Sequence, residues 1–329
     1  MSTRTKKSHF VPRFYLDRFA DSQRNVWQYD LDLQQVTGGE PEKMGLASNF
    51  YSPIDPDGNR IDDIEAMLSD FENLAAPLFD RLEEGENFIG RDREALAAFL
   101  AAQYLRSPVM ISVAAELYAK TVNRIASVTI SDDALFQENM DFLDKKSGKD
   151  TSKDDRERLR LSLLDPGKFE MSVLRHAGLH ALNGIPELAE IFLNLTWLVV
   201  EPRDQHLITS DSPVVRRCDP KTIHPIYGDG GFMNNSMVVT FPISPRRALE
   251  MSWKKPVQLP KVFISDKEQG RFYNRERASC FDRFLFSSIP DHGILRLGQK
   301  AKLTGKKSYR TEVGSPSPDV KVVRKLSEN

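Results

Sequence analysis

Six polar residues with chemically useful side chains lie in apolar surroundings along the chain, namely His9, Tyr15, Gln103, Arg106, Asp211 and Asn274. His9 comes just before an apolar segment, 12–19, that Pro12 can open as a short helix. Neutral imidazole can act as a general base or acid near pH 7, and the hydroxyl of Tyr15 can position a ligand. An amphipathic docking helix with a histidine at its start explains the same segment, so both interpretations remain open.

Gln103 and Arg106 are three residues apart and therefore share one face of a predicted helix. This helix is apolar all round over residues 95–102, which predicts a buried position. A guanidinium there has a large desolvation cost unless it meets a carboxylate or an anionic ligand. Pro108 removes a helical hydrogen bond and predicts a kink in a polar pocket wall. An internal ion pair and a ligand site fit Arg106 equally well.

Asp211 follows an apolar strand and stands two residues before Pro213. Such a strand end can present a carboxylate to a cleft, although an ordinary turn has the same sequence pattern. Asn274 and Arg277 lie on a predicted helix and could add polar groups, but solvated helix residues are the simpler interpretation. Substrate binding is therefore expected of Tyr15, Gln103, Arg106 and Asn274, and catalysis of His9 and Asp211.

The common catalytic and binding motifs are absent: the chain has no Gly-x-Gly-x-x-Gly, Walker, Gly-x-Ser-x-Gly or His-Glu-x-x-His pattern, and therefore no organic cofactor motif among them. His176 and His180 have a spacing that two metal ligands on one helix could share, but a third ligand such as Cys218 or His206 would have to come from elsewhere. Two ordinary helix histidines are the simpler explanation. A divalent metal held by Asp211 remains an alternative.

The expected elements predict an α+β protein in which a helical N-terminal and middle region packs on a mainly antiparallel C-terminal sheet. A hairpin is predicted over 26–37, and a helix that Pro77 bends over 61–82. Further helices are expected over 91–128, over 169–195 with a break near 184, and over 265–280. Short strands are expected at 197–200, 206–209, 214–215, 237–241, 249–253, 283–287 and 294–297.

Charge is unevenly distributed along the 329 residues, although the formal net charge is only −1. Residues 1–30 carry +3 and residues 299–329 carry +5, so residues 31–298 carry −9. Solvated tails explain the basic ends, but an anionic small molecule or a nucleic acid is an alternative partner. The expected organisation is a flexible basic N-terminus over 1–8, one intertwined domain over 9–298 with an exposed loop at 144–155, and a flexible basic tail over 299–329.

A cytoplasmic protein without a membrane segment is expected. Cys218 and Cys280 are the only cysteines, which fits a reducing compartment. The first residues are basic, but no apolar stretch of signal-peptide length follows them. The most apolar run, 191–200, is about half as long as a membrane helix needs.

An ordered set of motifs over residues 7–290 resembles a bacterial family of uncharacterised domains. The set comprises His9-x-x-Pro12-x-x-Tyr15-Leu16-x-x-Phe19, Asn49-Phe50-Tyr51, Gln103-x-x-Arg106-Ser107-Pro108, Ser210-Asp211-Ser212-Pro213-Val214, Pro242-Ile243-Ser244-Pro245, and Asn274 with Ala278. Ser107 and Ile243 stand where the family often has Thr and Leu. The resemblance implies no established activity, but it favours a shared site for the six polar residues.

Two functions follow as hypotheses. The first is a hydrolase or group-transfer enzyme acting on an anionic, phosphodiester-like substrate, in which Asp211 orients His9 or binds a metal. The second is a binding or sensor module in which the same residues form a structural network, with an ion pair between Arg106 and Asp211. A pocket touching at least four of the six residues would favour the enzyme.

Overall fold

The computed structural model describes residues 7–48, 50–51, 62–164, 169–173, 175–224, 228–255, 258, 260–303 and 320–324. The chain divides into two compact units: residues 1–111 with 181–308, and residues 112–180 with 309–329. The segment 9–298, expected to form one domain, thus contributes to both. Sequence from both sides of residues 112–180 builds the first unit. The polar residues considered above all belong to this first unit, apart from His176 and His180.

The N-terminal half of the first unit is mainly helical. Its elements are β1 (Lys7–His9), α1 (Arg13–Asp17), β2 (Val26–Asp30), β3 (Gln35–Gly39), the 3-10 turn η1 (Pro41–Lys43), β4 (Leu46–Ser48), α2 (Asp63–Ala75), η2 (Ala76–Leu78), α3 (Phe79–Glu83) and α4 (Gly90–Leu105). The predicted hairpin forms as β2 and β3. The helix predicted over 61–82 breaks at η2, which contains Pro77.

The C-terminal half supplies most of the strands. Its elements are α8 (Ile185–Asn194), β6 (Thr196–Pro202), β7 (Thr209–Ser210), β8 (Val215–Arg217), η4 (Pro220–Thr222), η5 (Gly231–Met233), β9 (Val238–Pro242), β10 (Ala248–Ser252), β11 (Val262–Ser265), α9 (Lys267–Ser279), β12 (Phe284–Ser287) and α10 (His292–Leu303). The two larger sheets have the strand orders β11-β6-β10-β9-β8 and β3-β2-β12-β7. Only β11 and β6 pair in parallel in these sheets, so the α+β class is confirmed.

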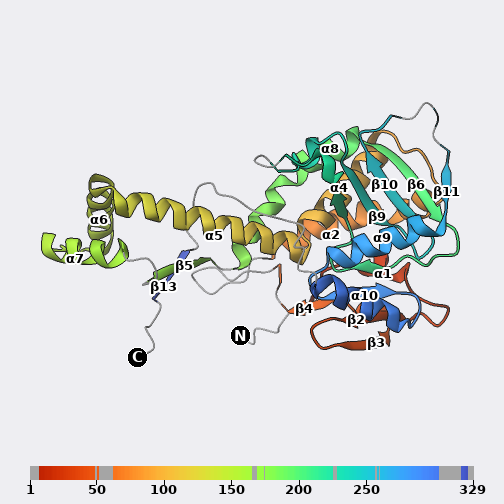
Figure 1. The fold of residues 1–329 in the computed structure, drawn as a ribbon, viewed down its shortest axis with the longest axis horizontal. Helices are drawn as coiled ribbons and strands as arrows, with labels where there is room; N and C mark the ends of the chain where they lie inside the picture. The colour runs from red at the N-terminus through yellow and green to blue at the C-terminus, as the bar shows by residue number, and fades with distance from the viewer. Residues whose placement is uncertain are drawn as a thin grey trace. The chain divides into compact units, whose positions relative to one another are not determined.

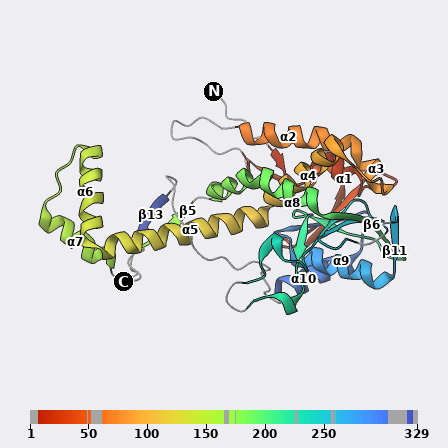
Figure 2. The same ribbon diagram turned by 90° about the horizontal axis from the view of Figure 1, so that it is seen from above.

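The five-stranded sheet lies between two helical layers, with α2 and α4 on one face and α9 on the other (Figures 1 and 2). Side chains on β9 alternate between these layers. Phe241 meets the rings of Phe79 and Phe99, while Thr240 faces the helix α9 residue Arg277. Because both faces are covered, β9 is buried at every position.

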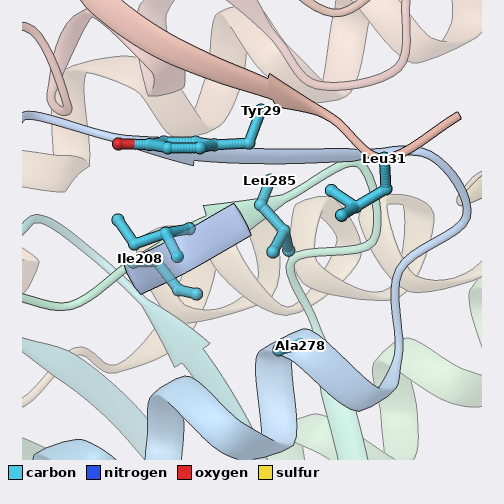
Figure 3. Packing of buried hydrophobic residues seen from close by; sticks show 6 residues of the cluster. Tyr29, Leu31, Ile208, Ala278 and Leu285 are labelled. Atoms are coloured by element: carbon cyan, nitrogen blue, oxygen red, sulfur yellow. The ribbon is translucent and has the colours of Figure 1, made fainter. Parts of the chain in front are cut away.

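The second sheet packs against α9 and α10 through a small apolar core that Figure 3 shows. Tyr29 and Leu31 from β2 and its end, Leu285 from β12 and Ala278 from α9 surround Ile208. Residues 294–297 belong to α10, so the predicted strand there is wrong. Ile294, Leu297 and Ala301 recur at helical spacing and all pack on this core, which four residues alone could not reveal.

The second unit contains most of α5 (Pro108–Ser131), α6 (Asp133–Ser147), α7 (Lys153–Leu164), β5 (Phe169–Val173), the start of η3 (Arg175–Gly184) and β13 (Val320–Arg324). The loop expected at 144–155 is shorter, because α6 ends at Ser147 and α7 begins at Lys153. Arg156 fixes this turn by donating to Asp144 at 2.8 Å.

The expected flexible tail is ordered in two places. Residues 299–303 continue α10, and residues 320–324 form β13, which pairs antiparallel with β5. This pairing also replaces the helix predicted to begin near Phe169. Partners about 150 residues apart in sequence leave no local signal in either segment.

No single helix among the described residues is long and apolar enough to cross a membrane; α4 and α5 reach that length only as a bent pair.

Candidate functional site

The structure distributes the six polar residues over different hydrogen-bonded sets. Three of them lie together at the N-terminal side of the first unit: His9 on β1, and Gln103 and Arg106 at the end of α4. Tyr15 contacts β7 and the end of β9, Asp211 binds the turn between α9 and β12, and Asn274 binds the chain leading into β7. The predicted site therefore divides into parts with different chemistry.

Arg106 is almost fully buried, with 3% of its side chain exposed, as the apolar helix predicts. Its Nη1 donates to Glu72 Oε1 on α2 at 2.6 Å. The backbone carbonyl of Arg106 accepts a hydrogen bond from the Tyr51 hydroxyl at 2.9 Å. The other two nitrogens, Nε and Nη2, are buried and have no partner in the described part of the chain.

Gln103 anchors the N-terminal segment on α4. Its Nε2 donates to the carbonyl of Phe10 at 3.2 Å. Its Oε1 is buried and accepts no hydrogen bond from the residues that the structure describes. The amide thus holds β1 in place with one end and presents an unused acceptor with the other.

His9 completes this group, which we call the N-terminal cluster and define as His9, Glu72, Gln103 and Arg106. Burial lowers the pKa of His9, and the Arg106 guanidinium acts in the same direction, while a backbone hydrogen bond at Met44 and the Glu72 carboxylate oppose it. The imidazole is therefore neutral near pH 7. Its Nδ1 is buried without a partner among the described residues and can accept a hydrogen bond.

Asp211 is enclosed by backbone donors. One carboxylate oxygen accepts from the N–H of Asp282 at 2.9 Å, and the other from the N–H groups of Arg283 and Phe284 at 2.7 and 2.8 Å. Burial raises the pKa of Asp211 to about 6 against the pull of these donors. Both oxygens are occupied, and the side chain has no exposed surface. The ion pair expected between Arg106 and Asp211 is wrong, because each has a different partner.

Asn274 and Tyr15 are also fully bonded. Asn274 accepts from the N–H of Ile208 at 3.0 Å and donates to the carbonyl of His206 at 2.8 Å. Tyr15 donates to the carbonyl of Pro242 at 2.7 Å and lies 2.7 Å from the hydroxyl of Thr209. Because its one proton goes to Pro242, Tyr15 accepts the proton of Thr209. These contacts join α1 and α9 to the sheets.

Three cavities in the described part of the first unit lie elsewhere. The one of about 340 Å³ has Asn274 as the only one of the six residues in its wall, and those of about 640 and 280 Å³ have none. None of these three cavities therefore joins four of the six polar residues. Among the described residues, no three His, Cys, Asp or Glu side chains are grouped as a metal ion would require.

The surroundings of two charged residues, Glu72 and Arg277, were not predicted from the sequence. Glu72 lies on the polar side of an amphipathic helix, where nothing distinguishes it from its solvated neighbours. Arg277 was interpreted as a solvated helix residue but is 1% exposed. Its four-residue spacing from Tyr273, which is also buried, marks one inward face of α9 and could have indicated this.

The first unit is thus an α+β structure with a partly unsatisfied, arginine-containing cluster next to its N-terminal strand. The chain belongs to the protein family of unknown function DUF4238, whose model matches residues 7–291. This match includes most of both segments of the first unit and the sequence between them, and the resemblance to an uncharacterised family is confirmed. Neither the curated proteins nor the solved structures include a match to the chain.

Proposed function

We propose that the N-terminal cluster binds an anionic ligand and that the protein acts on this ligand as a hydrolase or group-transfer enzyme. The supporting observation is a set of four buried polar atoms without partners in the described residues: Nδ1 of His9, Oε1 of Gln103, and Nε and Nη2 of Arg106. A folded protein leaves few buried polar atoms unsatisfied, and here they belong to three side chains of one cluster. A ligand that bonds to all four would remove this cost.

The atom types define the class of ligand. Nε and Nη2 form one edge of the guanidinium, which can donate two parallel hydrogen bonds to a carboxylate or phosphate. Oε1 of Gln103 and Nδ1 of neutral His9 accept hydrogen bonds, so they call for donor groups. An anionic group next to a hydroxyl or amine satisfies both requirements. The nearly complete burial of Arg106 favours a small molecule or the end of a chain over the surface of a duplex.

His9 is the residue with which the cluster could perform chemistry. A neutral imidazole with a free Nδ1 can take a proton from a ligand hydroxyl or from an attacking water. Glu72 has 27% of its side chain exposed and, through Nη1, holds the guanidinium in one orientation. Asp211 has no free oxygen for His9 or for a metal, so catalysis would proceed without it.

The alternative is a binding or sensor module with the same ligand and no turnover. Two observations favour it: none of the three described cavities touches four of the six polar residues, and Asp211 and Asn274 act as structural anchors. The two functions share the anion site and differ only in whether His9 transfers a proton.

Inorganic phosphate is a suitable first probe of the cluster, with melting temperature and calorimetry as measurements. We expect Arg106→Met to lower phosphate affinity roughly 10- to 100-fold, because two charged hydrogen bonds are lost. Arg246→Met is the matched control, since its side chain is 73% exposed on the same unit. Equal phosphate binding by the wild type and Arg106→Met would contradict the proposal.

Turnover separates the enzyme from the binding module. A generic phosphodiester, bis(p-nitrophenyl) phosphate, reports hydrolysis by colour. We expect His9→Asn to abolish hydrolysis while phosphate binding and the melting temperature stay close to those of the wild type. Phosphate binding without hydrolysis in the wild type would leave the binding module as the function.

A further inference from the structure

Arg277 on α9 is a buried guanidinium outside the N-terminal cluster. It is the largest fully buried side chain of the described residues, with 1% exposed. Its Nη2 has only two long contacts, 3.4 Å each, to the carbonyl and the hydroxyl of Thr240 on β9. Its Nε and Nη1 are buried and have no hydrogen-bond partner in the described part of the chain.

No group around Arg277 forms an ion pair with it in the described part of the chain. Tyr15 and Tyr273 influence it electrostatically, and burial raises the pKa of both phenols, so both are neutral. Cys280 lies buried at the end of the same helix. Glu276, the preceding residue on α9, has a larger influence than Tyr273, but burial raises the pKa of its carboxyl and it forms no salt bridge with Arg277 among the described residues.

The guanidinium nevertheless remains charged. Burial lowers the pKa of Arg277 to about 10, which is still well above neutral pH. A buried charge without a counter-charge is among the most costly features that a folded protein can contain. Water molecules could accept hydrogen bonds from Nε and from Nη1, but they would not compensate the charge.

We infer that Arg277 binds a small monovalent anion of the chloride type between α9 and β9. One positive charge matches one negative charge, and Nε and Nη1, which lie on different edges of the guanidinium, each offer an N–H donor that has no other described acceptor, so the ion can bind at either one. The enclosure of the side chain favours a compact ion, because a multiply charged oxyanion loses far more hydration on burial. The hydroxyl protons of Tyr15 and Thr209 are already committed, so they leave Arg277 as the charge-bearing donor.

This site is independent of the N-terminal cluster. It involves a different arginine, on α9 rather than α4, and an ion that is part of the folded protein rather than a reactant. The ion would link α9 to β9, an inner strand of the five-stranded sheet. Binding of the ion would therefore change the stability of the protein rather than a reaction that it performs.

The first test compares melting temperatures in sodium chloride and in sodium gluconate at equal ionic strength. We expect chloride to raise the melting temperature of the wild type by a few degrees, following mass action. Arg271→Met is the matched control, because Arg271 lies on α9 but has 52% of its side chain exposed in a pair with Glu268. The control and Arg106→Met should keep the chloride response, whereas Arg277→Met should lose it.

The second test does not need a variant that folds. Crystals of the wild-type protein grown or soaked in bromide should show an anomalous scattering peak within hydrogen-bonding distance of Nε or Nη1 of Arg277. Water or empty space at this position, or an unchanged chloride response in Arg277→Met, would overturn the inference. Loss of the response in Arg106→Met with no bromide at Arg277 would place the ion in the N-terminal cluster and overturn it as well.

Discussion

The N-terminal cluster and the surroundings of Asp211 both contain buried polar side chains. They differ in whether the polar atoms of these side chains have hydrogen-bond partners. In the cluster, His9, Gln103 and Arg106 keep four buried polar atoms without partners among the described residues. At Asp211, both carboxylate oxygens are filled by three backbone N–H groups. Both regions lie in the first unit, and both join segments distant in sequence. A polar group whose hydrogen bonds are made within the protein stabilises the fold, whereas a polar group without a partner is available to a ligand.

This comparison predicts different results for the same substitution strategy. Replacing a residue of the Asp211 region should lower the stability of the protein. The molecules that remain folded should bind the ligand as the wild type does. Replacing a residue of the N-terminal cluster should change phosphate binding, for Arg106, or hydrolysis, for His9, with little effect on stability. Three substitutions test this, in order of expected size.

Asp211→Ala should have the largest effect. The backbone N–H groups of residues 282–284 would lose their acceptor, and each buried unsatisfied donor costs about 1–3 kcal/mol. We expect the free energy of unfolding, measured in urea, to fall by roughly 3 kcal/mol or more. Asp80→Ala is the control, with an 88% exposed side chain and an expected change within about 0.5 kcal/mol. A stable Asp211→Ala protein that fails to bind phosphate would reverse the roles of the two regions.

Asn274→Ala should have an intermediate effect. It removes the acceptor for the N–H of Ile208 and the donor to the carbonyl of His206, so we expect a loss of about 2 kcal/mol. Asn274→Asp keeps the acceptor and loses only the donor, so the amide of Ile208 should exchange its hydrogen more slowly than in Asn274→Ala. Unchanged protection of that amide in both variants would mean that α9 does not anchor the chain before β7.

Much of the fold was predictable because local patterns determine it. The turn between β2 and β3, the break at Pro77 and the buried α4 all follow from residues within one element. The α10 helix and the β5–β13 pair were missed for one physical reason: their partners are distant in sequence. An apolar run of four residues fits a strand or a helix until the core it packs on is known.

The residues of the candidate site could be predicted from the sequence, but their arrangement in space could not. The apolar helix correctly marked Arg106 as buried, because its neighbours leave no solvent on that face. The partner of Arg106 was not foreseeable, since Glu72 and Asp211 are both acidic and only the fold brings one of them within 2.6 Å. The saturation of Asp211 was equally hidden, because its donors are backbone groups and every sequence has them.

His9→Asn should have the smallest effect on stability, visible only as a change in the pH dependence of the free energy of unfolding. Since the pKa of His9 is lowered in the folded protein, its contribution to stability is complete above about pH 6.5 and decreases as the pH falls towards the folded pKa. Urea unfolding of both proteins between about pH 7.5 and pH 5.5 measures it, and the wild type should lose more stability than the variant. Asp211 titrates in the same range with the opposite sign, since its pKa is raised to about 6, but it is present in both proteins and cancels. Bound phosphate should favour the imidazolium and reduce the difference, and a difference that phosphate leaves unchanged would place the anion away from His9.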